Sequence, residues 1–472
     1  MRHYFKESKA NNMAGISLAR KQKQVDMTQG SIVRHLLVFA FPLMLGNIFQ
    51  QLYNTVDTWV VGNYASNEAF SAVGSVTPII NVVIGLFTGL SSGAGAVISQ
   101  FYGARQKDKV EQAVHTAVAT TLILAAVFTV VGIAFTPWML RMTKMPANVM
   151  PEATTYLRIY FAGVIGLMLY NIGAGILRAV GDSKRPFYFL LVCALVNTVL
   201  DLLFVLGLRM GVAGVALATI IAQGISAVLV IVTLMRSKEW VRLELRKLWI
   251  HWDVLVKVLR VGVPAGLQIA VTSFSNVFLQ SYINYFGDNF MSGWTAYSKI
   301  DQLMLLPMQA LSLAVTTFVG QNIGADLPQR AKRSVGIAMG MIFGSLTLIM
   351  VPLMIFAPQL VAFFNPKPEV VEFGTLLLRL ITPFYLLYSV HDVVGGALRG
   401  AGNGKIPMIS ALLCFVVFRQ VYLFITANYI CNEVIPVSMA YPIGWLLSAV
   451  FLTVYFSRSK LTNAKTVEHS AK

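Results

Sequence analysis

The chain alternates long apolar stretches with short polar connections over almost its whole length. Each apolar stretch runs for about twenty residues or more, the length that an α-helix needs to cross the hydrocarbon core of a membrane. The buried strands of soluble proteins are much shorter, so this pattern predicts transmembrane helices. The twelve predicted helices fall near residues 32–62, 70–97, 112–136, 153–177, 186–207, 212–235, 254–284, 292–319, 332–357, 373–397, 407–429 and 436–457.

The second half of the chain repeats the first. The two halves match at a shift of 221 or 222 residues: SQFYGA at 99–104 matches GQNIGA at 320–325, and ILRAVGDSKRP at 176–186 matches ALRGAGNGKIP at 397–407. Each copy holds six predicted helices, an even number, so both copies start on the same side of the membrane and are parallel repeats. We therefore expect an all-α polytopic membrane protein with two six-helix lobes.

Glycines mark predicted turns and predicted close packing. The two LRxxG segments are expected to form turns in which a glycine adopts a positive φ. Glycine also recurs at every fourth position in the second and ninth predicted helices, which favours close helix approach at both places. The residues concerned are Gly85, Gly89 and Gly93, and Gly336, Gly340 and Gly344.

The composition agrees with a membrane protein, since 56% of the residues are hydrophobic and 12% are charged. Mean hydropathy is +0.68. The net charge of +17 comes mostly from Lys and Arg in connections on one side of the membrane; the basic residues on the other side are Arg141, Lys144, Arg209 and Lys367. Because basic loops stay in the cytoplasm, we expect cytoplasmic termini, a bacterial plasma (inner) membrane location and no nucleic-acid partner.

The same pattern predicts the boundaries of the parts. The expected parts are a cytoplasmic tail (1–30), an N-lobe with helices 1–6 (31–235), a linker (236–253), a C-lobe with helices 7–12 (254–457) and a second cytoplasmic tail (458–472). The linker alternates basic residues with tryptophan and leucine. We expect it to be amphipathic and to lie at the inner headgroup surface.

A carboxylate lies inside the first predicted helix. Asp57 shares one helical face with Gln50, Tyr53 and Asn54, so the helix carries a polar stripe. Lipid offers such a stripe no partners, so it must face the bundle interior or an aqueous cavity. We expect the helix to bend at Pro42, which is a candidate hinge.

Two further helices of the first lobe carry polar residues at a similar depth. Asn197 and Asp201 are one turn apart in the fifth helix, and Thr219 lies in the sixth. Oxygen ligands of this kind suit a hard cation, and two neighbouring carboxylates in low dielectric need a cation or a proton. We favour a Na⁺ or H⁺ coupling site over the alternative, a buried network that only orients the helices.

The second lobe does not copy this site. Leu279, Phe418 and Tyr422 stand at the positions that match Asp57, Asn197 and Asp201. The second lobe has polar residues of its own, among them Asn276, Gln280 and Asp301. For Asp301, neutralisation by Lys299 or Arg419 and a role with substrate or protons both remain open. We interpret His391 as a packed histidine.

Other chemistries find little support in the sequence. The segment from Gly400 to Lys405 is one residue short of a phosphate-binding loop and lacks its Ser or Thr. The sequence has no recognisable nucleophile, metal or cofactor motif, so we expect a transporter that is not an enzyme and uses no cofactor. A channel is disfavoured because its pore should be lined alike by both lobes, whereas the acids are placed asymmetrically.

In combination, these motifs resemble the multidrug and toxic compound extrusion (MATE) family, and more closely its bacterial DinF-like branch. The resemblance covers about residues 28–457. It implies a V-shaped cavity between two six-helix lobes. It also implies that Asp57, Asn197, Asp201 and Thr219 take part in Na⁺ or H⁺ binding, with Tyr53 and Asn171 beside them.

The expected function is therefore cation-coupled antiport, with Na⁺ or H⁺ as the coupling ion. The cargo would be an amphiphilic, cationic organic compound or drug, exported by alternating access from a monomer in the lipid bilayer. The alternative within the same superfamily is a flippase for a lipid-linked saccharide precursor. Such a flippase would need a strongly cationic cavity, and few basic residues lie within the spans.

Overall fold

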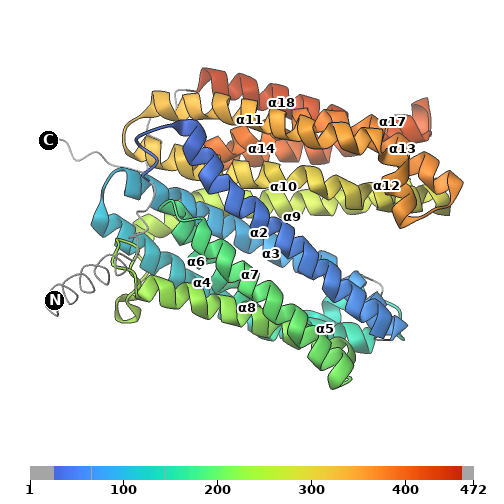
Figure 1. Cartoon of the computed structure of the whole chain (residues 1–472), viewed down its shortest axis with the longest axis horizontal. Helices are drawn as coiled ribbons and strands as arrows, with labels where there is room; N and C mark the ends of the chain where they lie inside the picture. The colour runs from blue at the N-terminus through green and yellow to red at the C-terminus, as the bar shows by residue number, and fades with distance from the viewer. Residues whose placement is uncertain (1–25, 65, 144, 460–472) are drawn as a thin grey trace, which may run out of the picture.

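The computed structural model describes residues 26–64, 66–143 and 145–459, and these residues form two helical lobes (Figure 1). The N-lobe consists of α2 (Ile32–Tyr64), α3 (Asn67–Gly103), α4 (Lys107–Met142), α5 (Met150–Ala162), α6 (Val164–Ala179), α7 (Lys184–Asp201) and α8 (Gly211–Met235). The C-lobe consists of α9 (Trp252–Tyr285), α10 (Asp288–Gly324), α11 (Pro328–Ile355), α12 (Ala357–Phe364), α13 (Pro368–Ile381), α14 (Tyr385–Gly400), α15 (Lys405–Ala411), α16 (Phe418–Ile425), α17 (Val434–Ser438) and α18 (Ala440–Arg458).

The predicted spans are confirmed, with one break inside them. Within the described residues, eleven stretches are long and apolar enough to cross a membrane, and the count rises to twelve if the bent pair α5 and α6 is one span. The sequence pattern predicted that pair as one straight helix, but the two helices meet at Gly163 with a bend of 46°. A side chain at Gly163 would meet Ile220 of α8 at 2.3 Å, so the glycine lets α8 pack against the bend.

The two lobes touch at one end of the molecule and diverge at the other (Figure 1). The end where they touch holds the first and last described residues and the turns at Gly181 and Gly402; we call it the termini end, and the opposite end the far end. Gly181 and Gly402 have φ values of +88° and +85°, as their turn motifs predicted.

Helix α2 belongs to both lobes. It runs diagonally across the molecule in Figure 1 and continues unbroken through Pro42, with no gap at the predicted hinge. In its first half, Leu36 and Phe39 join the hydrophobic core of the C-lobe, while Val60 and Val61 near its end join the core of the N-lobe. The preceding segment also differs from the predicted tail, because Met27 is fully buried in the C-lobe core.

Matching motifs of the two repeats interlock at the termini end. Gln100 of α3 donates a hydrogen bond to the carbonyl oxygen of Gly400 in the C-lobe (2.7 Å), and Gln321 of α10 donates one to the carbonyl oxygen of Ala179 in the N-lobe (2.9 Å). Gly324 permits this contact, since a Cβ there would lie 1.9 Å from the backbone oxygen of Gln100. Sequence reasoning found these motifs but assigned them only to helix ends.

The two predicted glycine stripes behave differently. A Cβ on Gly89 would lie 2.2 Å from the backbone nitrogen of Gly266, so the stripe on α3 does hold α9 close. The stripe on α11 does not pack this way: a Cβ on Gly336, Gly340 or Gly344 would meet nothing within 4 Å among the described residues. The prediction of close packing in the ninth span is therefore wrong.

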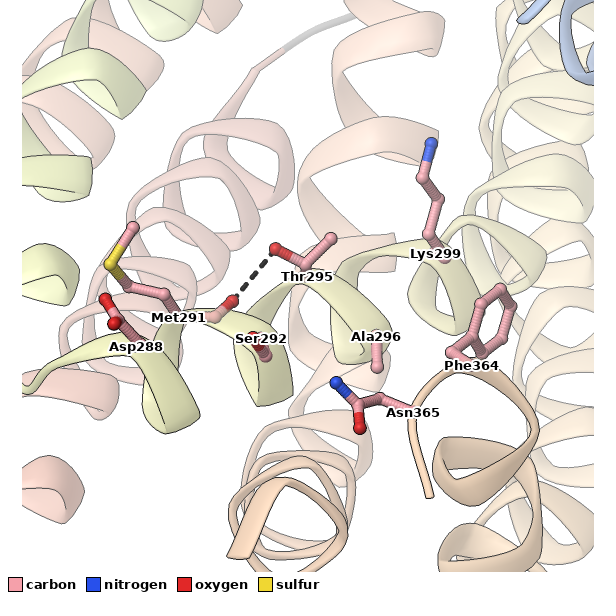
Figure 2. A pocket seen from close by; sticks show the side chains of 8 residues that line it. All are labelled: Asp288, Met291, Ser292, Thr295, Ala296, Lys299, Phe364 and Asn365. Carbon is pink, nitrogen blue, oxygen red and sulfur yellow. Dashed lines mark hydrogen bonds between the residues drawn. The ribbon is translucent and has the colours of Figure 1, made fainter. Parts of the chain in front are cut away.

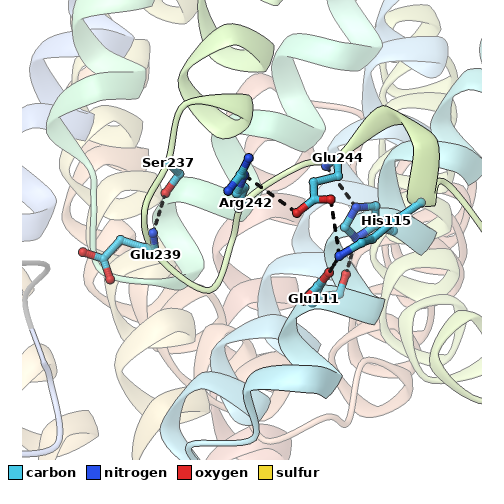
Figure 3. Close-up of polar contacts among 7 residues, drawn as sticks. Glu111, His115, Ser237, Glu239, Arg242 and Glu244 are labelled. Carbon is cyan, nitrogen blue, oxygen red and sulfur yellow. Dashed lines mark hydrogen bonds and ion pairs between the residues drawn. The ribbon is translucent and has the colours of Figure 1, made fainter.

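The linker between the lobes is fastened to the N-lobe. Val241 and Leu243 are buried in the core beside α4, and the Glu244 amide donates to His115 Nε2 (3.1 Å; Figure 3). Lys247 also forms an ion pair with Glu111 of α4 (3.0 Å). The predicted amphipathic segment is thus partly internal, although the Trp249 and Trp252 side chains remain exposed.

Candidate functional site

Two carboxyl groups meet inside the N-lobe. Asp57 of α2 and Asp201 of α7 interact directly through their side chains. Asp201 has no exposed surface, and neither of its carboxyl oxygens receives a hydrogen bond from the described residues. Asp57 Oδ1 is also buried and without a hydrogen-bond partner there. Two adjacent carboxylates in low dielectric repel each other, so this pair needs a positive charge or a proton between them.

An amide and a hydroxyl group accompany the acids. Asn197 lies one turn before Asp201, is 1% exposed, and has no partner for either polar atom of its side chain among the described residues. Thr219 is buried on α8, which packs against α7, and its hydroxyl group donates to the Val215 carbonyl oxygen (3.0 Å). That bond leaves the lone pairs of the Thr219 oxygen available. The unpartnered atoms fit a small oxygen-seeking cation or a proton.

Local helix irregularities position these residues. Asp201 is the last α-helical residue of α7, and a π-helical turn follows it from Leu202 to Gly207. Such a wide turn changes which side chains face a neighbouring helix, and π-helical turns often occur at functional sites. This turn could not be predicted from the sequence, because α-helical and π-helical turns have similar apolar composition.

Three tyrosines lie near the two acids, and only Tyr53 was predicted to do so. Tyr53 is 9% exposed and lies within the electrostatic reach of Asp57 and of Tyr160 on α5. Tyr156, also on α5, is close enough to interact with both Asp57 and Asp201. Sequence reasoning included Tyr53 but missed the two α5 tyrosines, whose one-turn spacing was the available signal. Tyr53 and Tyr156 therefore lie close to the two acids, and Tyr160 lies beside both of these tyrosines.

Three predicted residues do not join the acidic site directly. The Asn54 side chain is exposed and its Nδ2 donates to Gln51 Oε1 (3.4 Å). Gln50 is exposed and pairs with Tyr53. Asn171 donates from Nδ2 to the Leu167 carbonyl oxygen of its own helix (2.8 Å). The polar stripe predicted for α2 therefore splits. Tyr53 and Asp57 belong to the acidic site, whereas Gln50 and Asn54 are exposed.

Gln51 extends the stripe toward the other lobe. Its side-chain Nε2 donates to Oε1 of Gln302 on α10. This hydrogen bond links α2, which carries Asp57, to the helix that carries Asp301 in the C-lobe. Sequence reasoning did not identify either glutamine, because nothing in the pattern said that these two helices would be neighbours.

The C-lobe holds a separate polar cavity of about 210 Å³ in its far-end half. The predicted residues Asn276, Gln280 and Asp301 all line it. Its other walls include Leu279 and four aromatic side chains: Trp294, Tyr297, Tyr385 and Tyr441. The Tyr385 hydroxyl group donates a hydrogen bond to Asp301 Oδ2, while Oδ1 is buried with no partner among the described residues.

The two candidate cations do not neutralise Asp301. Arg419 is 2% exposed and donates to Ser275 Oγ (2.6 Å) and to Asn276 Oδ1 (2.8 Å). No ion pair joins Asp301 to Arg419 or to Lys299 in the described part of the chain. His391 is packed as predicted, between Gln268 (3.0 Å) and Ser448 (2.7 Å).

A larger cavity of about 550 Å³ lies on another face of α10, nearer its start. Side chains of α10, including Asp288 and Lys299, form one side, and Phe364 and Asn365 at the end of α12 form the other (Figure 2). None of the predicted site residues lines this cavity. Among the described residues, no three His, Cys, Asp or Glu side chains are grouped in a way that could hold a metal ion.

Comparisons with known proteins give a consistent picture. The MatE family model matches residues 42–203 and 264–425, one match in each repeat. The chain is 30% identical to "Probable multidrug resistance protein YpnP" of Bacillus subtilis (strain 168), over 93% of this chain and 98% of that protein. It is 24% identical to the FAD transporter of Shewanella oneidensis, over 89% and 93%.

A solved structure supports the same fold. It is the outward-facing conformation of a multidrug resistance MATE family transporter of the MOP superfamily. The likeness has a TM-score of 0.87 at 25% sequence identity, and covers 93% of this chain and 98% of that one.

Proposed function

We infer the mechanism from one premise: the chain belongs to the MATE family of multidrug transporters. It is a multi-pass membrane transporter, not an enzyme. We propose that it works by antiport, in which a monovalent cation, Na⁺ or H⁺, moves inward as an organic compound moves out. The proposed location is a bacterial inner membrane with both termini in the cytoplasm.

One observation carries the proposal: the Asp57–Asp201 pair is buried with carboxyl oxygens that receive no hydrogen bond from the described protein. A buried, unsatisfied polar atom costs about 1–3 kcal/mol, and more when it is charged. A bound Na⁺ or proton would remove this cost. Asn197 and Thr219 would supply further oxygen ligands to Na⁺, or hydrogen bonds around a protonated pair.

The arrangement of the two lobes supports this direction of coupling. The lobes are closed at the termini end by the Gln100 and Gln321 hydrogen bonds and diverge at the far end (Figure 1). With cytoplasmic termini, this is the outward-facing state. A cation can shift the equilibrium between two states only if it binds them with different affinity, so the acids must be arranged differently when the molecule faces inward.

The cargo is proposed to be an amphiphilic, cationic organic compound. The names of the relatives support drug export, although one relative is a FAD transporter, so membership of the family does not fix the cargo. Export against a gradient requires a driving ion, because no nucleotide-binding loop is present in the sequence.

Transport by inverted membrane vesicles tests the proposal. Accumulation of ethidium is measured with an imposed Na⁺ gradient, an imposed proton gradient, and neither, for the wild type and for Asp57→Asn and Asp201→Asn. We expect one of the two gradients to drive ethidium uptake in the wild type. The gradient-driven uptake rate of each variant should be at least about tenfold lower, since each variant removes one of the two paired acids. Asp288→Asn, at the far end of the C-lobe, is the matched control. Driven uptake that survives in both variants at the wild-type rate rejects the proposal.

A further inference from the structure

We propose that the linker and the start of α9 form a binding site for an acidic phospholipid. Arg246 and Arg260 hold the lipid phosphate, and Trp249 and Trp252 lie at the level of its headgroup. The site shares no residue with the acidic pair of the N-lobe, and its occupancy can be measured without any transport.

The two tryptophans mark the place where the lipid-facing side of α9 begins. Trp249 and Trp252 are 70% and 72% exposed. Further along α9, Val256, Val263 and Leu267 are exposed as well, so one apolar stripe continues from Trp252 along the helix. An exposed apolar stripe on a transmembrane helix faces acyl chains, and tryptophan is enriched at the headgroup level of membranes. The two rings therefore place this part of the chain at the headgroups.

Two exposed arginines flank the tryptophans. Arg246 precedes Trp249 by three residues, and Arg260 lies about two helical turns after Trp252 on α9. Neither arginine forms an ion pair within the described part of the chain. The guanidinium group is always charged, and its fork of N–H donors matches the oxygens of a phosphate group. Both arginines thus remain available to an anion at the membrane surface.

The acids of this region are already paired with other basic residues. Lys247 forms ion pairs with Glu111 (3.0 Å) and Glu244 (3.3 Å). Lys109 forms one with Asp253 at the start of α9 (2.9 Å). These acids are therefore occupied, and the positive charge of the two arginines calls for an anion from outside the chain.

The linker is held in place before any lipid binds. The Glu244 amide donates to His115 Nε2 (3.1 Å; Figure 3), and the His251 amide donates to Thr116 Oγ1 (3.1 Å). These bonds fasten the segment that carries Arg246 and both tryptophans to the first turns of α4. A site whose groups are ordered in advance loses less entropy when its ligand binds.

The class of ligand follows from charge and position. At the headgroup level, the anion that the membrane offers is the phosphate of a lipid. A zwitterionic lipid also carries a phosphate, but the two arginines repel its ammonium group. An acidic phospholipid has no such cation, so basic residues at the membrane surface attract it. We therefore expect a preference for phosphatidylglycerol over phosphatidylcholine.

Phosphatidylglycerol with dibrominated acyl chains is the probe, because bromine quenches the fluorescence of nearby tryptophan. The full-length protein is reconstituted into phosphatidylcholine bilayers that contain increasing fractions of the brominated lipid. The signal of the site is the difference between the wild type and a protein with Trp249→Phe and Trp252→Phe. We expect this signal to show a preference for phosphatidylglycerol of at least about fivefold. The preference should shrink at about 1 M salt, which screens exposed charges.

Arginine variants test the charge of the site. Arg246→Gln and Arg260→Gln, measured as the same difference, should each lower the phosphatidylglycerol preference about threefold, and the double variant should abolish it. Arg333→Gln is the matched control, because Arg333 is an exposed arginine near the start of α11 that also has no ion pair among the described residues. It should leave the preference within about twofold. Thermal unfolding of each variant checks its fold.

Three results would overturn the inference. The first is equal quenching of the wild type by brominated phosphatidylcholine and brominated phosphatidylglycerol at matched fractions. The second is an unchanged preference in a folded double variant of Arg246 and Arg260. The third is an equal loss in Arg333→Gln, which would show that the basic surface acts as a whole and that no local site exists.

Discussion

The two lobes are repeats of one sequence unit, yet their far-end halves hold different chemistry. In the N-lobe, Asp57 and Asp201 face each other, and Asp201 is neutralised by no basic residue of the described chain. In the C-lobe, Asp301 lines a cavity with aromatic walls and accepts a hydrogen bond from Tyr385, and Arg419 stacks on Tyr441 of the same cavity. The N-lobe therefore has two acids in direct contact, while the C-lobe has an acid, Asp301, beside a cavity.

At the termini end the lobes remain alike. Gln100 and Gln321 hold equivalent positions in the repeats, and so do their acceptors, Ala179 and Gly400. The contacts that close one end of the molecule are therefore the same in both repeats. The polar residues of the far end have diverged, since Leu279, Phe418 and Tyr422 stand where the first repeat has Asp57, Asn197 and Asp201.

The largest predicted difference in stability is between alanine variants of the two glycine stripes. Gly89→Ala would place a Cβ 2.2 Å from Gly266, whereas Gly340→Ala would meet nothing within 4 Å. We expect Gly89→Ala to destabilise the protein by about 3 kcal/mol or more, because two backbones must separate. Gly340→Ala should be neutral or stabilising by up to about 1 kcal/mol, since alanine favours helix. Thermal unfolding in detergent measures both, and equal responses would contradict the account.

The next prediction concerns the stability that is lost when either glutamine at the termini end is replaced. Gln321 makes two inter-segment bonds, since its Oε1 also accepts from the Met27 amide (3.2 Å), while Oε1 of Gln100 has no partner among the described residues. Each buried bond that is lost leaves a polar group unpaired at a cost of about 1–3 kcal/mol. Gln321→Ala should therefore cost about twice as much as Gln100→Ala.

Both glutamine variants should also open the termini end. A single cysteine placed in the turn at residues 180–183, in a protein whose Cys193, Cys414 and Cys431 are replaced by alanine, reports this opening through its labelling rate by a water-soluble maleimide. The rate should rise more in Gln321→Ala than in Gln100→Ala. Unchanged labelling in both variants would show that other contacts hold the lobes closed.

The smallest predicted effect concerns the linker, which is fastened to the N-lobe alone. The carboxylates of Glu111 and Glu244 raise the pKa of Lys247 above its ordinary value. A raised pKa stabilises the folded state at all pH values below the unfolded pKa of about 10.4, and this stability is lost only as pH rises through the folded pKa. Glu111→Gln should thus lower the melting temperature slightly and equally at pH 6 and pH 8. Glu239→Gln is the control, because the Glu239 carboxylate points away from Glu111 and Glu244 in Figure 3. A decrease in melting temperature that is as large or larger in this control would contradict the assignment.

The sequence predicted most of the fold. Helix lengths and the repeat are encoded by runs of apolar residues, and the positive φ values at Gly181 and Gly402 follow from turn chemistry. The bend at Gly163 was not predictable, because glycine also occurs in straight membrane helices. The α11 glycines show the limit of periodicity: a stripe of small residues permits close packing but does not name a neighbour.

The candidate site was predictable only in part. Acids in membrane helices are conspicuous, so Asp57 and Asp201 could be found from their positions alone. Asn54 was placed with them by helical spacing, but its side chain is exposed near Gln51. Gln100 and Gln321 were noticed and yet misjudged, because a hydrogen bond between lobes depends on tertiary packing that spacing does not reveal.

The most direct test of the central claim measures the ion and not the drug. Proteoliposomes are loaded with ethidium on one side, and the counter-movement of protons or Na⁺ is recorded with pH-sensitive and Na⁺-sensitive dyes. Our account predicts that ethidium drives one of these ions across the membrane in the wild type, and that this flux disappears in Asp57→Asn and in Asp201→Asn. Ethidium-driven ion flux of wild-type size in both variants would contradict it.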